Sequence, residues 1–210
     1  MKKTEMIVLA TMAVVFIGLG SLAWGGGEPK DIVNGGITVI HDETEDFLGD
    51  APDYADIENA RISEVGKNRI DMSITPAGAI PAEPEEAYIQ YYWQFPGVCD
   101  DGSPTDKYGM VATWTGPEEP EETGIWSANW IETDCITHET WKGASADSIS
   151  FEEGGVRVRA SLDDFWAEGV EDGELYWFAG VRLAPNELPV DVVPEVYNNP
   201  PEIFATWMNR

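Results

Sequence analysis

A chain of 210 residues has room for one ordinary domain and a targeting segment. Apolar residues make up 43% of it, with 9 tryptophans, 7 tyrosines and 7 phenylalanines, which excludes an intrinsically disordered chain. The formal charge of −27, from 39 acidic and 12 basic residues, argues against nucleic acid and anionic membrane surfaces as partners, because both are bound through lysine and arginine. Such a surface suits high salt or hard cations such as calcium, although a merely soluble acidic surface is the simpler interpretation.

Residues 1–24 have the features of an export signal. Lys2 and Lys3 precede an uncharged apolar run at residues 6–24, and small residues predict cleavage after Ala23. The run is also long enough to span a bilayer, so an uncleaved N-terminal anchor is the alternative, and residues 6–24 would then be the only contact with a membrane. In both cases the acidic body is expected to be extracellular or at the cell surface.

The glycine-containing stretch 25–35 predicts a linker, and residues 36–210 are expected to form one domain. Nine of its segments alternate apolar and polar residues or are rich in β-branched and aromatic residues, as strands with one buried face are. They are residues 37–40, 60–65, 69–75, 86–95, 108–114, 123–132, 148–152, 156–162 and 175–184. The clearest alternation, at 86–95, has one apolar face: Ala87, Ile89, Tyr91, Trp93 and Phe95. In segments 69–75 and 156–162 the residues expected to point outward are polar. They are Arg69, Asp71, Ser73 and Thr75 in the first segment, and Arg157 and Arg159 in the second.

One helical turn is expected, at residues 161–166, because Ser161 can cap it and Asp163 and Asp164 would lie in its first turn. From residue 185 onward the chain is rich in proline and is expected to be an irregular tail. About nine short strands with polar turns predict an all-β fold, an antiparallel, jelly-roll-like β-sandwich. A parallel α/β fold would require helical crossovers that this sequence does not offer.

Cys99 and Cys135 are the only cysteines. In an exported chain they are expected to form a disulfide, which would stabilise the fold by about 3–4 kcal/mol in the loop-entropy model. Two free thiols are the alternative.

Two acidic loops are candidate calcium sites, because clustered carboxylates are unfavourable unless they are solvated or neutralised by a cation. In the second loop, oxygen-bearing side chains surround Gly102, which lets several ligands converge. The expected ligands are Asp46, Asp50, Asp53 and Asp56 in the first loop, and Asp100, Asp101, Ser103 and Asp106 in the second. The alternative is that both loops are simply solvated.

Four aromatic residues are candidates for a flat face that binds sugars: Tyr88, Tyr92, Trp126 and Trp130. Aromatic rings can cover the apolar face of a sugar while polar neighbours take its hydroxyls. The alternative is that these residues lie in the core. The chain has two histidines, His41 and His138, and no hydrolase motif or phosphate-binding loop, so neither catalysis nor a nucleotide cofactor is expected.

Short motifs carry a resemblance to a known class of domain. Asp46-Phe-Leu-Gly-Asp50, Tyr54-Ala-Asp56-Ile57 and residues 70–75 are followed by the aromatic strand 88–95 and, later, by residues 175–184 and 191–194. This order resembles secreted β-sandwich domains of the DOMON and family-9 carbohydrate-binding-module type, over roughly residues 42–195. The resemblance implies an extracellular jelly-roll-like sandwich, with sugar, haem or cation binding in some members. Haem is not expected, because no axial pair is evident beyond Met110 and His138.

The sequence therefore predicts a non-catalytic extracellular binding or surface module, with polysaccharide or other cell-envelope components as partners and calcium as a stabilising ion. Two alternatives remain open. One is a structural cell-envelope protein without a small ligand. The other is a secreted hydrolase that uses two of the many carboxylates.

Overall fold

The structure, a computed structural model, describes the domain but not the segment before it. The described residues are 37–42, 51–65, 69–98, 104–117, 119, 122–134, 137, 140–161, 163, 174–185, 188–193 and 205–208. The expected export segment 1–24 and the whole expected linker 25–35 therefore lie outside the described residues. No helix among the described residues is long and apolar enough to cross a membrane.

Strands make up most of the described chain. They are β1 (Ile37–His41), β2 (Ile57–Glu64), β3 (Arg69–Pro76), β4 (Tyr88–Val98), β5 (Pro104–Thr115), β6 (Ile125–Thr133), β7 (Thr140–Ser145), β8 (Ser148–Glu152), β9 (Gly155–Ser161), β10 (Glu174–Arg182), β11 (Asp191–Val193) and β12 (Ala205–Met208). One 3-10 helix, η1 (Asp53–Ala55), precedes β2. The expected all-β fold is thus confirmed.

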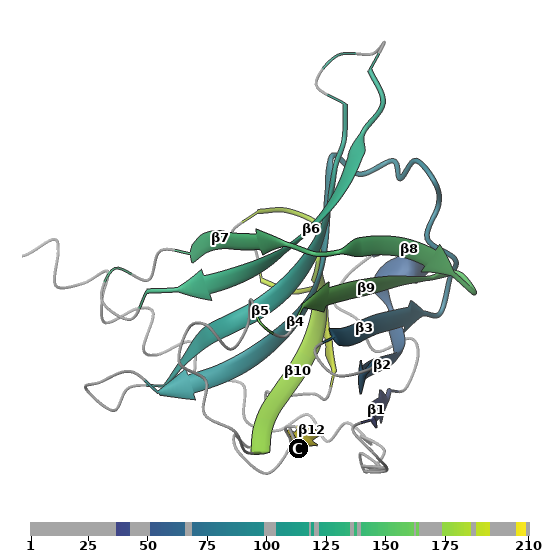
Figure 1. Cartoon of the computed structure of the whole chain (residues 1–210). Helices are drawn as coiled ribbons and strands as arrows, with labels where there is room; N and C mark the ends of the chain where they lie inside the picture. Colours follow the sequence, from purple (N-terminus) through teal and green to yellow (C-terminus); the bar gives the residue numbers. More distant parts are fainter. Residues whose placement is uncertain are drawn as a thin grey trace, which may run out of the picture.

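The strands form two antiparallel sheets (Figure 1). The first has the order β1-β2-β3-β9-β8, and the second has the order β11-β10-β4-β5-β6-β7, with β12 pairing the beginning of β10. Non-consecutive strands are neighbours in both sheets, since β3 pairs β9 and β4 pairs β10. The molecule is therefore a sandwich in which each sheet joins strands that are distant in the sequence.

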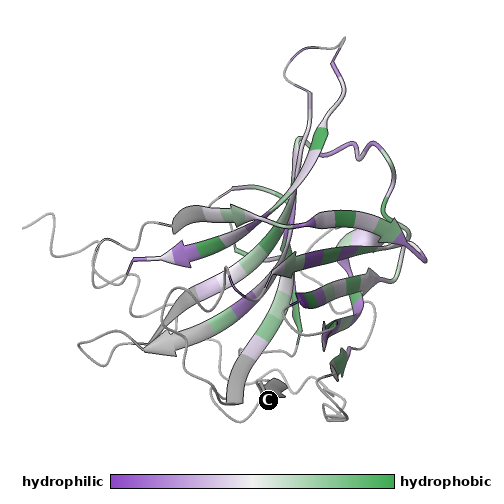
Figure 2. Cartoon of the chain, viewed as in Figure 1, coloured by the Kyte–Doolittle hydropathy of each residue, from purple (hydrophilic) through white to green (hydrophobic). Residues whose placement is uncertain are grey.

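Alternation explains why the two sheets pack face to face. Ile62, Met72 and Val158 are cross-strand neighbours on β2, β3 and β9, and all three are fully buried. On the facing sheet the long aromatic strand β4 contributes Tyr91, Trp93 and Phe95, which are at most 1% exposed. Figure 2 shows hydrophobic and hydrophilic residues alternating along the strands of the first sheet. One face of each of these strands is therefore available for polar chemistry.

Three strands differ from the expectation drawn from the sequence: β7, β11 and β12. They contain six, three and four residues, and the two strands after residue 185 are too short to show a period of two. The tail is therefore not wholly irregular, because Val192 and Val193 of β11 are buried beside β10. One hydrogen bond of the expected helical turn lies within the described residues. The Asp163 N–H donates to Ser161 Oγ at 3.1 Å, which is the bond that a serine at a helix N-cap accepts. The remainder of that turn lies outside the described residues.

Two tyrosines connect η1 to β4. The hydroxyl of Tyr91 donates to the backbone carbonyl of Tyr54 at 2.5 Å, and the hydroxyl of Tyr54 donates to the carboxylate of Glu86. Burial raises the pKa of both tyrosines above the ordinary value, and the neighbouring Glu86 charge adds to the effect. Both phenols therefore remain protonated hydrogen-bond donors throughout the physiological pH range.

A buried carboxylate joins the two sheets. Asp191 of β11 is 8% exposed, and its Oδ2 accepts a hydrogen bond of 2.6 Å from the backbone N–H of Ile57 at the start of β2. Because that amide is buried, removal of its acceptor leaves a donor that water cannot easily satisfy.

We expect Asp191→Ala to lower the free energy of unfolding by about 1–2 kcal/mol, since a buried hydrogen bond to a charged acceptor is lost. Urea unfolding followed by tryptophan fluorescence measures this. Asp191→Asn, which retains one carbonyl oxygen, is the matched control and should recover part of the loss. If the two variants are as stable as the parent protein, this hydrogen bond does not hold the sheets together.

Candidate functional site

The four aromatic residues expected to form one sugar-binding face lie on opposite faces of the second sheet. Tyr88 and Tyr92 are on its outer face. Trp126 and Trp130 pair with Trp114 and Met110, whose side chains point into the core. The common platform expected from the sequence is therefore not formed, because these two tryptophans follow the inward register of β5.

Tyr92 is buried although it is on the outer face. It is 2% exposed, its ring meets Phe178 edge-on at 6.1 Å, and the Arg182 guanidinium lies 5.0 Å from the ring centre. The ring also lies over Gly180 of β10, where any side chain would collide with it. Trp130 is likewise 5% exposed. Neither ring offers a free face to a sugar.

Most of the expected calcium and disulfide residues lie outside the part of the chain that the structure describes. Asp46, Asp50, Asp100, Asp101, Ser103, Cys99 and Cys135 lie outside the described residues, as does the side chain of Asp106. Asp53 is exposed within η1, whereas Asp56, which follows η1, is 2% exposed. Among the described side chains there is no group of three or more histidine, cysteine or acidic residues that could hold a metal ion.

The polar centre of the structure is elsewhere, on the outer face of the first sheet. Ser63, Asp71 and Arg159 are cross-strand neighbours there, and the next row contains Arg61, Ser73 and Arg157. Four of the six arginines in the chain belong to strands of this sheet at outward positions: Arg61, Arg69, Arg157 and Arg159. In a chain of charge −27, this is a marked concentration of positive charge.

Asp71 organises this face. Its carboxylate is 4% exposed and accepts hydrogen bonds from Arg159 Nε (2.6 Å), Arg159 Nη2 (2.8 Å) and Arg157 Nε (3.0 Å). Arg157 also donates through Nη1 to Glu152 Oε2 at 3.1 Å. Burial by itself would raise the pKa of Asp71, but the hydrogen bonds and charges of Arg159 and Arg157 outweigh it, so this pKa lies below the ordinary value. Asp71 is therefore a fixed negative charge.

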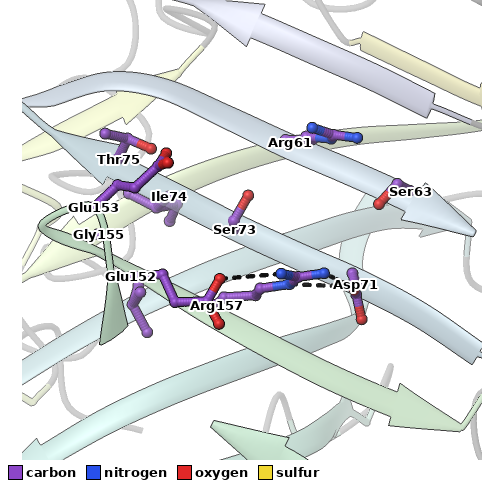
Figure 3. A pocket seen from close by; sticks show the side chains of 11 residues that line it. Arg61, Ser63, Asp71, Ser73, Ile74, Thr75, Glu152, Glu153, Gly155 and Arg157 are labelled. Atoms are coloured by element: carbon purple, nitrogen blue, oxygen red, sulfur yellow. Dashed lines mark hydrogen bonds and ion pairs between the residues drawn. The ribbon is translucent and has the colours of Figure 1, made fainter. Parts of the chain in front are cut away.

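A hollow of about 190 Å³ opens beside this network (Figure 3). Its position follows from side-chain size, because the small Ser73 stands between Arg61 and Arg157 in the cross-strand row. The walls are Arg61 and Ser63 from β2, Ser73 and Thr75 from β3, and Glu152, Glu153 and Arg157 from the hairpin of β8 and β9. Glu153 reaches the rim because the hairpin turn holds it at φ 53°, next to Gly154 at φ 85°.

Several polar groups around this hollow have unused hydrogen-bonding capacity. Arg61 and Glu153 form no ion pair with another described residue, and the hydroxyls of Ser63, Ser73 and Thr75 make no side-chain hydrogen bond within the described part of the chain. A second hollow, lined by Ser148, Ser150, Glu152, Arg157 and Arg159, lies on the other side of the Arg157–Glu152 pair. The two hollows make a polar track across β2, β3, β9 and β8.

Alternation in the sequence places Asp71, Ser73, Thr75, Arg157 and Arg159 on outward faces but does not assemble them. The missing information is that β9 lies beside β3, with Ser73 opposite Arg157. Alternation within one strand predicts which side chains point outward, but it does not predict which strand is next to it. The amino-acid composition of these faces could have indicated the site. The outward residues of segments 69–75 and 156–162 are arginine, aspartate, serine and threonine.

Comparison with known proteins gives no independent indication of function. No protein-family model matches the chain, and neither a curated protein nor a solved structure is significantly similar to it. The geometry of the polar track is therefore the feature that indicates a function.

Proposed function

We propose that the protein is an exported, non-catalytic binding module that presents the outer face of its five-stranded sheet to an extracellular polysaccharide or a similar cell-envelope polymer. The observation that carries this proposal is the polar track of two adjacent hollows on that face. Serine and threonine hydroxyls both donate and accept hydrogen bonds, while arginine only donates and glutamate only accepts. Such a mixture matches the hydroxyls of a sugar chain, and two neighbouring hollows match a ligand with repeating units.

The state of Asp71 favours binding over hydrolysis. A glycosidase that uses two carboxylates needs one of them protonated as a general acid, with a raised pKa. Asp71 has the opposite property, because Arg157 and Arg159 hold its pKa below the ordinary value. Glu152, which lines both hollows, is itself hydrogen-bonded to Arg157. These carboxylates serve to orient the arginines.

The resemblance to DOMON and family-9 carbohydrate-binding-module domains supports the same proposal, since it implies a secreted sandwich that binds sugars in some members. The apolar segment at residues 6–24, whether cleaved or kept as an anchor, supports a place outside the cell. The proposal differs from the expectation drawn from the sequence in the location of the site, which is now the arginine-bearing sheet and not the four aromatic residues.

The proposed module also includes a Cys99–Cys135 disulfide and bound calcium. Strands β4 and β6, which precede the two cysteines, both pair β5 in antiparallel fashion and therefore end on the same side of the sheet. Calcium at the loops that contain Asp46–Asp56 and Asp100–Asp106 would reduce the self-repulsion of a chain of charge −27.

Affinity electrophoresis through gels that contain neutral or acidic polysaccharides tests the proposed function. We expect at least one polysaccharide to retard the protein and no release of reducing ends on prolonged incubation. Ser73→Tyr, which fills the hollow from an outward position, should abolish the retardation. Ser127→Tyr on the second sheet is the matched control and should leave it unchanged. Absence of retardation by every polysaccharide, or equal retardation of both variants, contradicts the proposal.

A further inference from the structure

We infer that the hollow beside Arg61 takes an acidic sugar unit, whose carboxylate binds the Arg61 guanidinium. This inference rests on the proposed function and specifies the class of ligand. Among the described residues, three of the four arginines on the arginine-bearing face form ion pairs with acidic residues, and the fourth does not. Arg69 pairs with Asp147 at 3.3 Å, Arg157 pairs with Asp71 and Glu152, and Arg159 pairs with Asp71. Arg61 alone among these four has no acidic partner within the described part of the chain.

An unpaired arginine is unexpected in a chain with 39 acidic residues and 12 basic ones. The guanidinium is planar and always charged, and it binds a carboxylate through two parallel hydrogen bonds. Figure 3 shows Arg61 at one side of the hollow, apart from the Glu152–Arg157–Asp71 chain of interactions on the other side. The position left open next to Arg61 is therefore suited to a carboxylate supplied by a ligand.

The remaining walls suit the hydroxyls of the same ligand. Adjacent strands are about 4.8 Å apart, so the backbones of Arg61 and Arg157, on either side of β3, are about 10 Å apart. Ser73 forms the floor between them, and Ser63 and Thr75 add hydroxyls from the same face. Glu153 lies at the rim near Thr75 in Figure 3 and offers acceptors for hydroxyl donors. A simple inorganic anion would use Arg61 but would leave these groups unused.

The net charge of the protein gives this interaction a distinctive salt dependence. At 0.01 M salt, where the Debye length is about 30 Å, the charge of −27 repels an anionic ligand from a distance. At 0.15 M this length falls to about 8 Å, so most of that repulsion is screened, while the contact between Arg61 and the carboxylate is affected less. The affinity for an acidic sugar should therefore rise between these two salt concentrations, which is the reverse of the usual behaviour of an ion pair.

The experiment compares trigalacturonate and trimannuronate with their methyl esters, which have nearly the same size but no charge. Titration calorimetry at 0.15 M salt should show that at least one acid binds at least tenfold more tightly than its ester. Arg61→Gln should remove this preference, and Arg61→Lys should retain part of it. Arg69→Gln, on the same sheet but outside the hollow, should leave it unchanged. Thermal melts of all variants show whether each is folded.

The outcomes separate this inference from the proposed function. If acids and esters bind equally, or if Arg61→Gln keeps the preference, the inference is overturned while polysaccharide binding stands. If neither acid binds but a neutral polysaccharide retards the protein, the inference is likewise overturned. If no polysaccharide of either kind binds, both the inference and the proposed function fail.

Discussion

Trp93→Ala is expected to lower the free energy of unfolding by about 3–5 kcal/mol, the range for truncating a large aromatic residue in a core. Trp93 is 0% exposed in the middle of β4, with Ala179 of β10 on one side and Met110 of β5 on the other. Because both neighbouring strands are held by backbone hydrogen bonds, they cannot move inward to fill the cavity. Urea unfolding at constant ionic strength measures the change without altering the screening of the acidic surface.

Two matched variants define this prediction. Trp93→Phe should cost less, about 1–2 kcal/mol, because it keeps a ring and removes an indole N–H that is buried without a hydrogen-bond partner in the described structure. Ile125→Ala, at a side chain that is 69% exposed, should change stability by no more than about 0.5 kcal/mol. A loss below about 1 kcal/mol for Trp93→Ala would show that β4 is not the packed centre of the sandwich.

Asp71→Asn is expected to lower the free energy of unfolding by about 2–3 kcal/mol at pH 7. Removing one partner of a buried ion pair leaves the other partner uncompensated, and the loss here is reduced because Arg157 and Arg159 are partly exposed to water. Asn can still accept a hydrogen bond, but it cannot neutralise the two guanidinium groups. Asp147→Asn, whose partner Arg69 is 60% exposed, is the control and should have an effect below about 1 kcal/mol.

The difference in free energy of unfolding between the parent protein and Asp71→Asn should depend on pH. The pKa of Asp71 is lower in the folded protein than its unfolded value of about 3.9. The charge of Asp71 therefore contributes its full stabilisation above about pH 4 to 5, and this contribution is lost as the pH falls through the folded pKa. Urea midpoints at about pH 7, 5 and 3 should converge toward low pH for the two proteins. A constant difference across this range would show that Asp71 acts through packing and not through its charge.

The sandwich could be predicted from the sequence because its strands are long enough to show a period of two. Residues 69–75, 86–95 and 156–162 alternate clearly, and in the structure they correspond to β3, β4 and β9. β4 continues past the expected end at Pro96-Gly97 because the pairing with β5 shifts register between Phe95 and Gly97. Such a bulge absorbs a residue that does not fit the ladder.

The candidate site could be predicted only in part, because it depends on which strands are neighbours. Arg61 lies on β2 and Arg157 on β9, and the hollow between them exists because β3 places the small Ser73 in the same row. Similarly, Trp126 is expected on an exposed face from the sequence, but its pairing with Trp114 places it on the inner side. Both alternating sets of residues in β6 include apolar side chains, so alternation alone does not show which set is buried, and the pairing with β5 decides it.

The pairing of distant strands also sets the order in which the chain can fold. β4 is without its second neighbour until β10 has been made, and β3 is without its second neighbour until β9 has been made. At about 5–20 residues per second, translation leaves about 4–15 s between the end of β4 and the start of β10. The second sheet cannot close during this interval, and the first sheet cannot close until β9 has been made, so the nascent chain remains open to chaperones and to a translocation channel for much of it. A topology that delays closure in this way is compatible with export of the chain before it folds.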